Sequence, residues 1–367
     1  MSSDLRRSCT IDLAYPYHQP DTPSQRLRAV ADYMEAEGLD ADPSLNGPAA
    51  LRLEGKIAAL TGMPAAAWFP TGVMAQCAAA RIHAEKSGSR RVLLHPSSHL
   101  ELHEENAHQH LHALDPEIIG RWGEPVRAED LVPGAACAFV ELPQRHDGGA
   151  LPDWATLQAL KDRAAELDLT LHMDGARLWS CRPFYEDRSY AEIVSGFASV
   201  YVSLYKDIGA PIGAVLAGSE DFIRQARIWR VRMGGALVAP WPALPDALRL
   251  IDKRLEQMPG FVARASELAE ALSGIEGLSV EPSPAHTNLL NLRLDCTHKV
   301  AMAARDTVAR EHGVWLANNV WDLEGGRPVV LEITVGERVA SAELDRIVAA
   351  VRSLADAIAR ANSQPAD

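Results

Sequence analysis

Apolar and polar positions along the chain follow first a helical and then a strand-like period. Residues 24–37 and 49–61 carry apolar side chains three and four positions apart, which predicts a helix in each segment. The apolar run AAAWF then stops at Pro70-Thr71-Gly72, as a buried strand does, and a helix-favouring stretch follows from Met74 to Glu85. The polar segment 42–48 (DPSLNGP) is expected to be a loop.

Short apolar runs and helical stretches alternate through the middle of the chain. The pattern predicts a helix at 154–167 and strands at 91–94, 136–142, 169–173, 199–204 and 212–216. This alternation is typical of an α/β fold in which helices cover both faces of a mostly parallel sheet. In such sheets the ligand lies at the carboxyl ends of the strands, and Asp174 and Lys206 both fall at predicted strand ends.

Beyond about residue 250 the pattern changes. A helix near 242–257 precedes long helices at 299–312 and 342–361 and predicted strands at 278–280, 288–294 and 329–335. A chain of 367 residues is longer than a single core usually organises. We therefore expect an N-terminal arm (1–20), a large α/β domain (21–249) and a smaller α+β domain (250–367).

Composition and charge limit the possible partners. The hydrophobic content of 47% is that of a globular protein, and the formal charge of −13, with no basic block, argues against a nucleic acid or an acidic membrane as partner. No apolar run is long enough for a signal peptide or a membrane span. The five cysteines are scattered without C-x-x-C spacing, which fits reduced thiols and predicts a cytoplasmic protein.

Asp174 and Lys206 carry the candidate chemistry. Asp174 lies in LHMDGARLWS (171–180), and Lys206 follows it by 32 residues, enough for one return crossover of an α/β fold. An amine and a buried carboxylate in one pocket can hold pyridoxal phosphate, because the amine condenses with the aldehyde and the carboxylate keeps the pyridine nitrogen protonated. Burial would lower the pKa of Lys206 and favour its nucleophilic form. The alternatives are a lysine that points into water and an aspartate that only starts an Asp-Gly turn.

In these residues the chain resembles the threonine aldolase and β-eliminating lyase family of fold type I pyridoxal-phosphate enzymes. The resemblance runs from about Asp12 to Val351 and is densest at HMDGAR and around Lys206. It implies a large domain with a mostly parallel sheet of the seven-stranded type and a smaller C-terminal domain. It also implies that Lys206 forms the Schiff base with the cofactor and that Asp174 is the partner of the pyridinium nitrogen.

Further residues match the family around the cofactor. Thr71, Gly72 and Val73 match its phosphate-binding turn, and a glycine that leads into a helix offers backbone N–H groups to an anion. An ordinary capped helix would have the same sequence. Arg177 resembles a family residue near the cofactor's phenolic oxygen or the substrate carboxylate, although a surface arginine in a salt bridge is the alternative.

Three histidines are candidates for proton transfer or for positioning. His99 resembles the family histidine that stacks on the cofactor ring, and an imidazole is suited to act as general base on a β-hydroxyl. His146, in RHDGGALP, matches a histidine placed near the substrate hydroxyl. His172 precedes Asp174 by two residues, so on a strand it faces the same side and could orient that carboxylate, or it could be an ordinary core histidine.

The density of histidines between residues 95 and 112 raises a metal site as an alternative. One helical face could hold His95, His99 and His103, and one strand face could hold His108, His110 and His112. The H-E-x-x-H pattern of helical zinc sites does not occur. The cofactor is therefore favoured over a metal, and no metal ligand is assigned.

The substrate end of the pocket departs from the family pattern. Glu332 stands where the family has an arginine that binds the α-carboxylate, and a glutamate would repel that group. The other departures are Arg230-Val231 in place of Arg-Lys, Val238 in place of an arginine, and Ala14-Tyr15 in place of Ser-Asp. Either the substrate is not a simple β-hydroxy amino acid, or the role has passed to another arginine, namely Arg230, Arg232, Arg327 or Arg338.

The resemblance implies retro-aldol cleavage of a β-hydroxy-α-amino acid to glycine and an aldehyde. In that reading His99 or His146 takes the β-hydroxyl proton, and Arg177, Arg230 and His146 bind the substrate. The alternatives are another pyridoxal reaction (β-elimination, racemisation or transamination) and a cofactor-binding protein without catalysis. The resemblance also implies a homodimer or homotetramer with the active site at the subunit interface.

Overall fold

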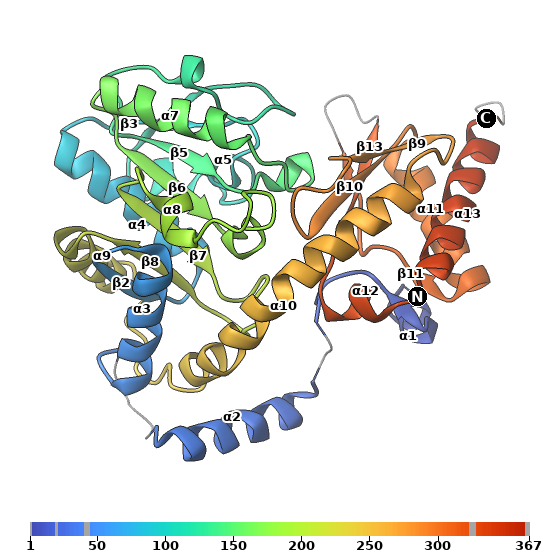
Figure 1. Cartoon of the computed structure of the whole chain (residues 1–367), viewed down its shortest axis with the longest axis horizontal. Coiled ribbons are helices and arrows are strands. Elements are labelled where there is room, and N and C mark those ends of the chain that lie inside the picture. The colour runs from blue at the N-terminus through green and yellow to red at the C-terminus, as the bar shows by residue number, and fades with distance from the viewer. Residues whose placement is uncertain (1, 19–20, 40–44, 323–327, 364–367) are drawn as a thin grey trace. The chain divides into compact units, whose positions relative to one another are not determined.

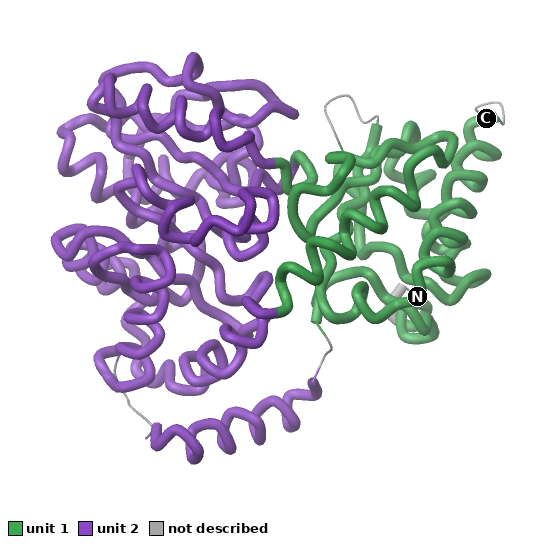
Figure 2. Tube along the Cα trace, viewed as in Figure 1, with its two compact units in different colours: residues 1–20, 147–150, 257–367 green, residues 21–146, 151–256 purple. Residues whose placement is uncertain are grey.

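The fold was analysed in a computed structural model, which describes residues 2–18, 21–39, 45–322 and 328–363. The chain divides into two compact units (Figure 2). Unit 1 comprises residues 1–20, 147–150 and 257–367, and unit 2 comprises residues 21–146 and 151–256. The N-terminal segment therefore belongs to the same unit as the C-terminal part of the chain.

Unit 2 is built on a sheet of seven strands (Figure 1). In sheet order these are β2 (Ala65–Phe69), β8 (Ala214–Gly218), β7 (Ser199–Ser203), β6 (Leu171–Gly175), β5 (Cys137–Glu141), β3 (Arg91–Leu94) and β4 (Asp115–Ile118). Only β8 runs antiparallel to its neighbours; the other pairs are parallel. The expectation of an α/β fold with a large, mostly parallel sheet is confirmed.

Nine helices accompany this sheet in the described part of unit 2 or start there. They are α2 (Pro23–Glu37), α3 (Pro48–Thr61), α4 (Gly72–Ser87), α5 (His99–Leu102), α6 (Ala107–His110), α7 (Trp154–Glu166), α8 (Tyr190–Val194), α9 (Glu220–Arg232) and α10 (Ala243–Leu272). The alanines Ala75, Ala78 and Ala79 of α4 are fully buried in a core with Phe69 and Leu216. Small side chains allow α4 to lie close to the sheet, which positions its N-terminus at the strand ends.

Unit 1 contains an antiparallel sheet of four strands and a two-stranded parallel pair. The four strands are, in sheet order, β12 (Trp321–Asp322), β13 (Val329–Thr334), β10 (Leu289–Leu294) and β9 (Leu278–Glu281). The parallel pair is β1 (Ile11–Asp12) with β11 (Val314–Trp315), and the helices are α1 (Ser2–Ser8), α11 (His298–His312), α12 (Glu337–Ser341) and α13 (Leu344–Asn362).

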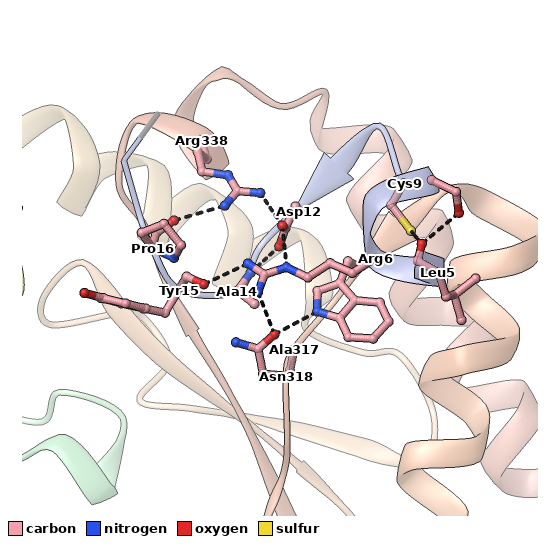
Figure 3. A network of polar contacts seen from close by, with 12 residues as sticks. Leu5, Arg6, Cys9, Asp12, Ala14, Tyr15, Pro16, Ala317, Asn318 and Arg338 are labelled. Atoms are coloured by element: carbon pink, nitrogen blue, oxygen red, sulfur yellow. Dashed lines mark hydrogen bonds and ion pairs between the residues drawn. The ribbon is translucent and has the colours of Figure 1, made fainter. Parts of the chain in front are cut away.

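Ionic contacts fasten the N-terminal segment within unit 1 (Figure 3). The Nε of Arg6 donates to Asp12 over 2.8 Å, and its other nitrogens donate to the Tyr15 carbonyl and to Asn318. Arg338 makes a second ion pair with the same carboxylate of Asp12. Asp12 of β1 therefore links α1 and α12 within the unit.

The main difference from the expected elements is the length of α10. The sequence predicts a helix near 242–257, whereas α10 continues through Pro259 to Leu272. Proline lacks the N–H for one intrahelical bond, so Pro259 weakens the helix at that point. The helix continues because Phe261, Val262 and Leu268 are buried beyond it. Across the described ranges we find no helix with the length and apolar content that a bilayer span requires.

Candidate functional site

Asp174 and the segment of Lys206 lie on neighbouring strands of the large sheet. Asp174 is the fourth residue of β6 and pairs in register with Tyr201 of β7. β7 ends at Ser203, whose hydroxyl accepts a hydrogen bond from the backbone N–H of Lys206 over 3.2 Å. Because β6 and β7 are parallel, their carboxyl ends meet at one edge of the sheet, as the sequence predicts.

Burial and nearby charges determine the state of Lys206. Desolvation lowers the pKa of its amine to about 8, and the positive charge of Arg177 acts in the same direction. Asp174 and Glu141 oppose this shift. Near neutral pH the unprotonated, nucleophilic amine is therefore far more abundant than for an ordinary lysine.

Asp174 is held in place from two sides. Its side chain is only 4% exposed, and burial raises the pKa of the carboxyl while the charge of Lys206 lowers it. The backbone N–H of Ala176 donates to Oδ1 over 3.0 Å, and the side-chain amide of Gln76 donates to Oδ2. Hydrogen bonds to both oxygens favour the ionised form that a pyridinium partner needs.

The N-terminus of α4 lies beside this pair and is suited to an anion. Thr71 caps the helix by accepting from the Met74 N–H over 3.2 Å. A Cβ at Gly72 would collide with the hydroxyl of Tyr201 and lie 3.2 Å from that of Tyr205, so only glycine fits there. The first N–H groups of a helix have no acceptor within it, and together with the helix dipole they attract a phosphate.

His99 is paired with a buried glutamate. Its Nδ1 lies 2.9 Å from Oε1 of Glu104, whose side chain is 1% exposed. Desolvation raises the pKa of Glu104 to about 7, whereas desolvation, aided by Lys206, lowers the pKa of His99 to about 4. Near neutral pH His99 is therefore uncharged, and Glu104 decides which ring nitrogen carries the proton.

His146 lies in a short series of aromatic rings with His99. The Nε2 atoms of His103 and His146 are 2.7 Å apart, and the ring of His103 lies 5.1 Å from that of His99. The exposed Trp122 contacts His146 at the other end, with 5.5 Å between ring centroids. The structure thus brings His99 and His146 together, with His103 between them.

The histidine-rich segment does not adopt the two faces considered for a metal. α5 begins only at His99, and His108 and His110 belong to α6 rather than to a strand. Neither element extends beyond four residues. In the described ranges, no group of three or more His, Cys, Asp or Glu side chains could hold a metal ion.

Sequence reasoning missed three acidic or polar residues of this region. Glu104 follows the candidate base by five residues, Gln76 lies on α4, and Glu141 ends β5 opposite Asp174 in the sheet register. Burial raises the pKa of Glu141 to about 8, and the neighbouring Asp174 acts in the same direction. Only Glu141 had a detectable signal, since a carboxylate at a predicted strand end follows the same rule that singled out Asp174.

Arg230, a candidate for substrate binding, is engaged elsewhere in unit 2. Its Nη1 donates to the Trp68 carbonyl over 2.5 Å and lies 4.0 Å from Glu54. Glu54 is buried, accepts from the Trp68 N–H over 2.8 Å and pairs with Arg227 over 2.7 Å. This cluster joins α3, β2 and α9, so its charges support the fold.

Replacement of the central carboxylate should reveal that structural role. We expect Glu54→Gln to lower the free energy of unfolding by about 3 kcal/mol, the low end for a broken buried pair, because Arg230 loses its counter-charge while Arg227 is partly exposed. Urea unfolding would measure the change. The matched control is Glu37→Gln, which removes an exposed pair with Arg52 and should cost less than about 1 kcal/mol. Equal effects of the two variants would contradict the assignment.

The other positions that depart from the family pattern lie on both units. Val238 is 82% exposed, and Glu332 pairs in register with Asn291 in the antiparallel sheet. Arg338 is bound to Asp12 and to the Pro16 carbonyl, next to the Ala14-Tyr15 segment (Figure 3). Arg327 lies outside the described residues.

Pyridoxal phosphate fits the residues present. Lys206 offers an amine with a lowered pKa, Asp174 a buried carboxylate, and Gly72 a space that a Cβ would fill at a helix N-terminus. These three groups match the aldehyde, the ring nitrogen and the phosphate of that cofactor. The sheet and this arrangement together define a pyridoxal-phosphate-dependent enzyme of fold type I.

Comparison with known proteins places the chain more narrowly. The beta-eliminating lyase family matches residues 20–295, so the chain belongs to that family and is a pyridoxal-phosphate-dependent lyase that acts on an amino acid. The probable low-specificity L-threonine aldolase 2 of Arabidopsis thaliana is 29% identical over 77% of this chain and 81% of its own. The low specificity L-threonine aldolase of Escherichia coli K12 is 27% identical over 59% and 67%.

Solved structures of similar proteins support the same family and fold. A proposed L-allo-threonine aldolase from Listeria monocytogenes superposes with a TM-score of 0.87 at 30% identity, over 97% of this chain and 99% of that one. A threonine aldolase from Leishmania major shares the fold, with a TM-score of 0.71 at 16% identity over 95% and 99%. The expected family, fold type and cofactor are confirmed.

Proposed function

We propose that this protein cleaves the Cα–Cβ bond of a β-hydroxy-α-amino acid, giving glycine and an aldehyde. The observation that carries the proposal is the grouping in one unit of Lys206, Asp174 and a His99 imidazole that is paired with the buried Glu104. The relatives named threonine aldolase support it. When bound, pyridoxal phosphate condenses with amines through its aldehyde, and its ring accepts the electron pair released at Cα.

In this proposal Lys206 binds the aldehyde of the cofactor and Asp174 contacts its ring nitrogen. Lys206 supplies a nucleophilic amine because its pKa is lowered to about 8. Asp174, fixed by Gln76 and Ala176, keeps a negative charge beside the ring nitrogen. The N–H groups at Thr71, Gly72 and Val73 would hold the phosphate.

His99 is the proposed general base for the β-hydroxyl proton. When Glu104 is ionised, it accepts from Nδ1–H of His99, so the ring's Nε2 carries no proton and can take one. When Glu104 is protonated, it donates to Nδ1, the ring proton moves to Nε2, and the base is lost. His146, coupled through His103, would lie near the substrate hydroxyl as a second polar contact.

Arg177 is the proposed partner of the substrate carboxylate. Its side chain is buried, and after desolvation its positive charge has the largest effect in lowering the pKa of Lys206. A guanidinium binds a carboxylate through two parallel hydrogen bonds. Arg230 is less suited because its charge already faces Glu54.

The proposed role of Glu104 predicts a pH dependence. In the wild type, kcat/KM should rise as the pH increases through about 7, because ionisation of Glu104 frees Nε2 of His99 as a base. Glu104→Gln cannot ionise, so this rise should disappear and kcat/KM at pH 8 should fall about 10- to 100-fold, the equivalent of one charged hydrogen bond.

The control is Glu105→Gln, since Glu105 neighbours Glu104 but is exposed. That variant should keep the wild-type pH profile. If Glu104→Gln retained the rise near pH 7, the glutamate would not control the base.

A direct assay separates the proposed reaction from the alternatives. Proton NMR would follow purified, pyridoxal-loaded protein with L-threonine and with L-allo-threonine. Glycine and acetaldehyde appearing together would support the proposal. Ammonia and a keto acid would indicate β-elimination instead, which the changes at Glu332, Val238 and Ala14-Tyr15 make the main competitor.

We also propose that the protein is at least a homodimer. Apolar side chains from the end of α9 to the start of α10 are exposed, namely Ile228, Val231, Leu237, Val238 and Trp241. A surface of this kind favours contact with a second subunit. Sedimentation should show a dimer or tetramer at micromolar concentration, whereas a fully active, cofactor-loaded monomer would exclude the proposal.

A further inference from the structure

Behind Asp174 lies a line of four buried polar side chains. Gln76 donates through Nε2 to Asp174, and its Oε1 lies 2.9 Å from Nε2 of His172. Ser199 Oγ is 2.7 Å from Nδ1 of His172 and 2.7 Å from Nε2 of His83. The four side chains are at most 5% exposed, and they come from α4, β6 and β7.

The direction of every hydrogen bond in this line follows from chemistry. An ionised carboxylate can only accept, so the amide nitrogen of Gln76 faces Asp174 and its oxygen must accept from Nε2–H of His172. A neutral His172 then has an acceptor at Nδ1, which takes the Ser199 proton. Ser199 in turn accepts from Nε2–H of His83.

The two imidazoles remain uncharged in the neutral range. Desolvation lowers the pKa of His83 to about 4 and that of His172 well below its usual value. Each ring is also packed on a phenylalanine, His83 against Phe222 with 5.0 Å between centroids and His172 against Phe139 with 4.6 Å. Neither ring can therefore protonate or turn readily, which fixes the tautomers.

We propose that His83, Ser199, His172 and Gln76 form a one-way hydrogen-bond relay that keeps Asp174 ionised and correctly oriented toward the cofactor's ring nitrogen. Gln76 and Ser199 are thus positioning residues for the cofactor, an inference that rests on the proposed role of Asp174. Hydrogen bonds aligned in one direction polarise one another, so each donor increases the stabilisation of the terminal carboxylate. His172 acts on Asp174 through Gln76 rather than by direct contact.

The stability of the core does not by itself explain why four buried polar side chains lie in one line. Four buried polar groups are costly unless every one is satisfied, and apolar residues of similar size would usually be as stable. A relay, unlike a merely satisfied core, predicts effects on the cofactor that decrease with distance from Asp174.

The test uses cofactor binding and the pH titration of the bound cofactor's visible absorption, neither of which requires a substrate. We expect Gln76→Leu to weaken binding of pyridoxal phosphate about tenfold, the loss of one charged hydrogen bond, and Ser199→Ala about threefold. Both should shift the pH at which the absorption changes, with Gln76→Leu shifting it more. Thr61→Val removes another buried hydroxyl of unit 2 and should change neither quantity.

The variant Asp174→Asn shows whether a negative result concerns the relay alone or the proposed role of Asp174 on which the relay depends. If that variant changes binding and spectrum but Gln76→Leu and Ser199→Ala do not, the relay is wrong. If Asp174→Asn also has no effect, the role of Asp174 itself is wrong. Should a variant not fold, nitrogen NMR of labelled histidines in the wild-type protein decides, since Nδ1–H on His172 would reverse the direction and overturn the proposal.

Discussion

Lys206→Ala is expected to abolish covalent attachment of the cofactor and to lower kcat by about 10³-fold or more, because both the nucleophile and the nearest proton-transferring amine are lost. Borohydride reduction followed by mass spectrometry measures the attachment directly. The wild-type chain should gain the mass of the reduced cofactor, whereas the variant should not.

The control for this experiment is Lys86→Ala, which removes an exposed lysine from the last turn of α4. It should leave both the mass increment and kcat unchanged. Normal turnover by Lys206→Ala would show that another group performs the chemistry, and an attached cofactor in that variant would identify another lysine as the nucleophile.

Asp174→Asn is expected to lower kcat about 100-fold or more, since the variant loses a charged hydrogen bond of about 3 kcal/mol to the protonated ring nitrogen. Asparagine has nearly the same shape, and its one oxygen can still accept from the Ala176 N–H although it cannot also accept from Gln76, so the fold should be preserved. Cofactor affinity and kcat measured on the same preparation would separate weaker binding from slower chemistry.

Asp168→Asn is the matched control, because Asp168 is exposed just before β6. It should behave as the wild type in both measurements. A wild-type kcat for Asp174→Asn would mean that the ring nitrogen needs no negative partner in this enzyme.

The pattern of apolar residues along the sequence was enough to predict the strands that carry the candidate site. The segment 91–94 matches β3, and the strand expected at 199–204 differs from β7 by one residue. These strands are short apolar runs between turn residues. The spacing of the apolar side chains and the flanking turn residues therefore indicate the same strand boundaries. The position of Lys206 just after β7 follows from the same reasoning.

Pattern alone failed where tertiary packing decided the outcome. The helix was expected only near 242–257, yet buried apolar residues beyond Pro259 extend α10 to Leu272. No element was expected at 220–232, where the amphipathic α9 forms and packs against α4. Strand β4 is four residues long and contains Pro116, which a sheet accommodates at its edge.

Some residues of the candidate site could be predicted from the sequence, and others could not. Lys206, Asp174 and Gly72 could be found because each stands at the end of a strand or the start of a helix, where ligands bind. Glu104 and Gln76 could not, since their importance depends on which side chains meet across the fold. Sequence spacing carries no information on contacts between residues 76 and 174.

Three ionisable groups of the site have pKa values displaced toward neutrality: Glu104 to about 7, Glu141 to about 8 and Lys206 to about 8. Such interacting groups exchange protons as a set rather than singly. Loading the apoprotein brings in an anionic phosphate and consumes the free amine of Lys206, so protons must pass between the pocket and the surrounding buffer. The heat of cofactor loading measured by calorimetry should therefore depend on the ionisation enthalpy of the buffer chosen, and the slope of that dependence counts the protons exchanged.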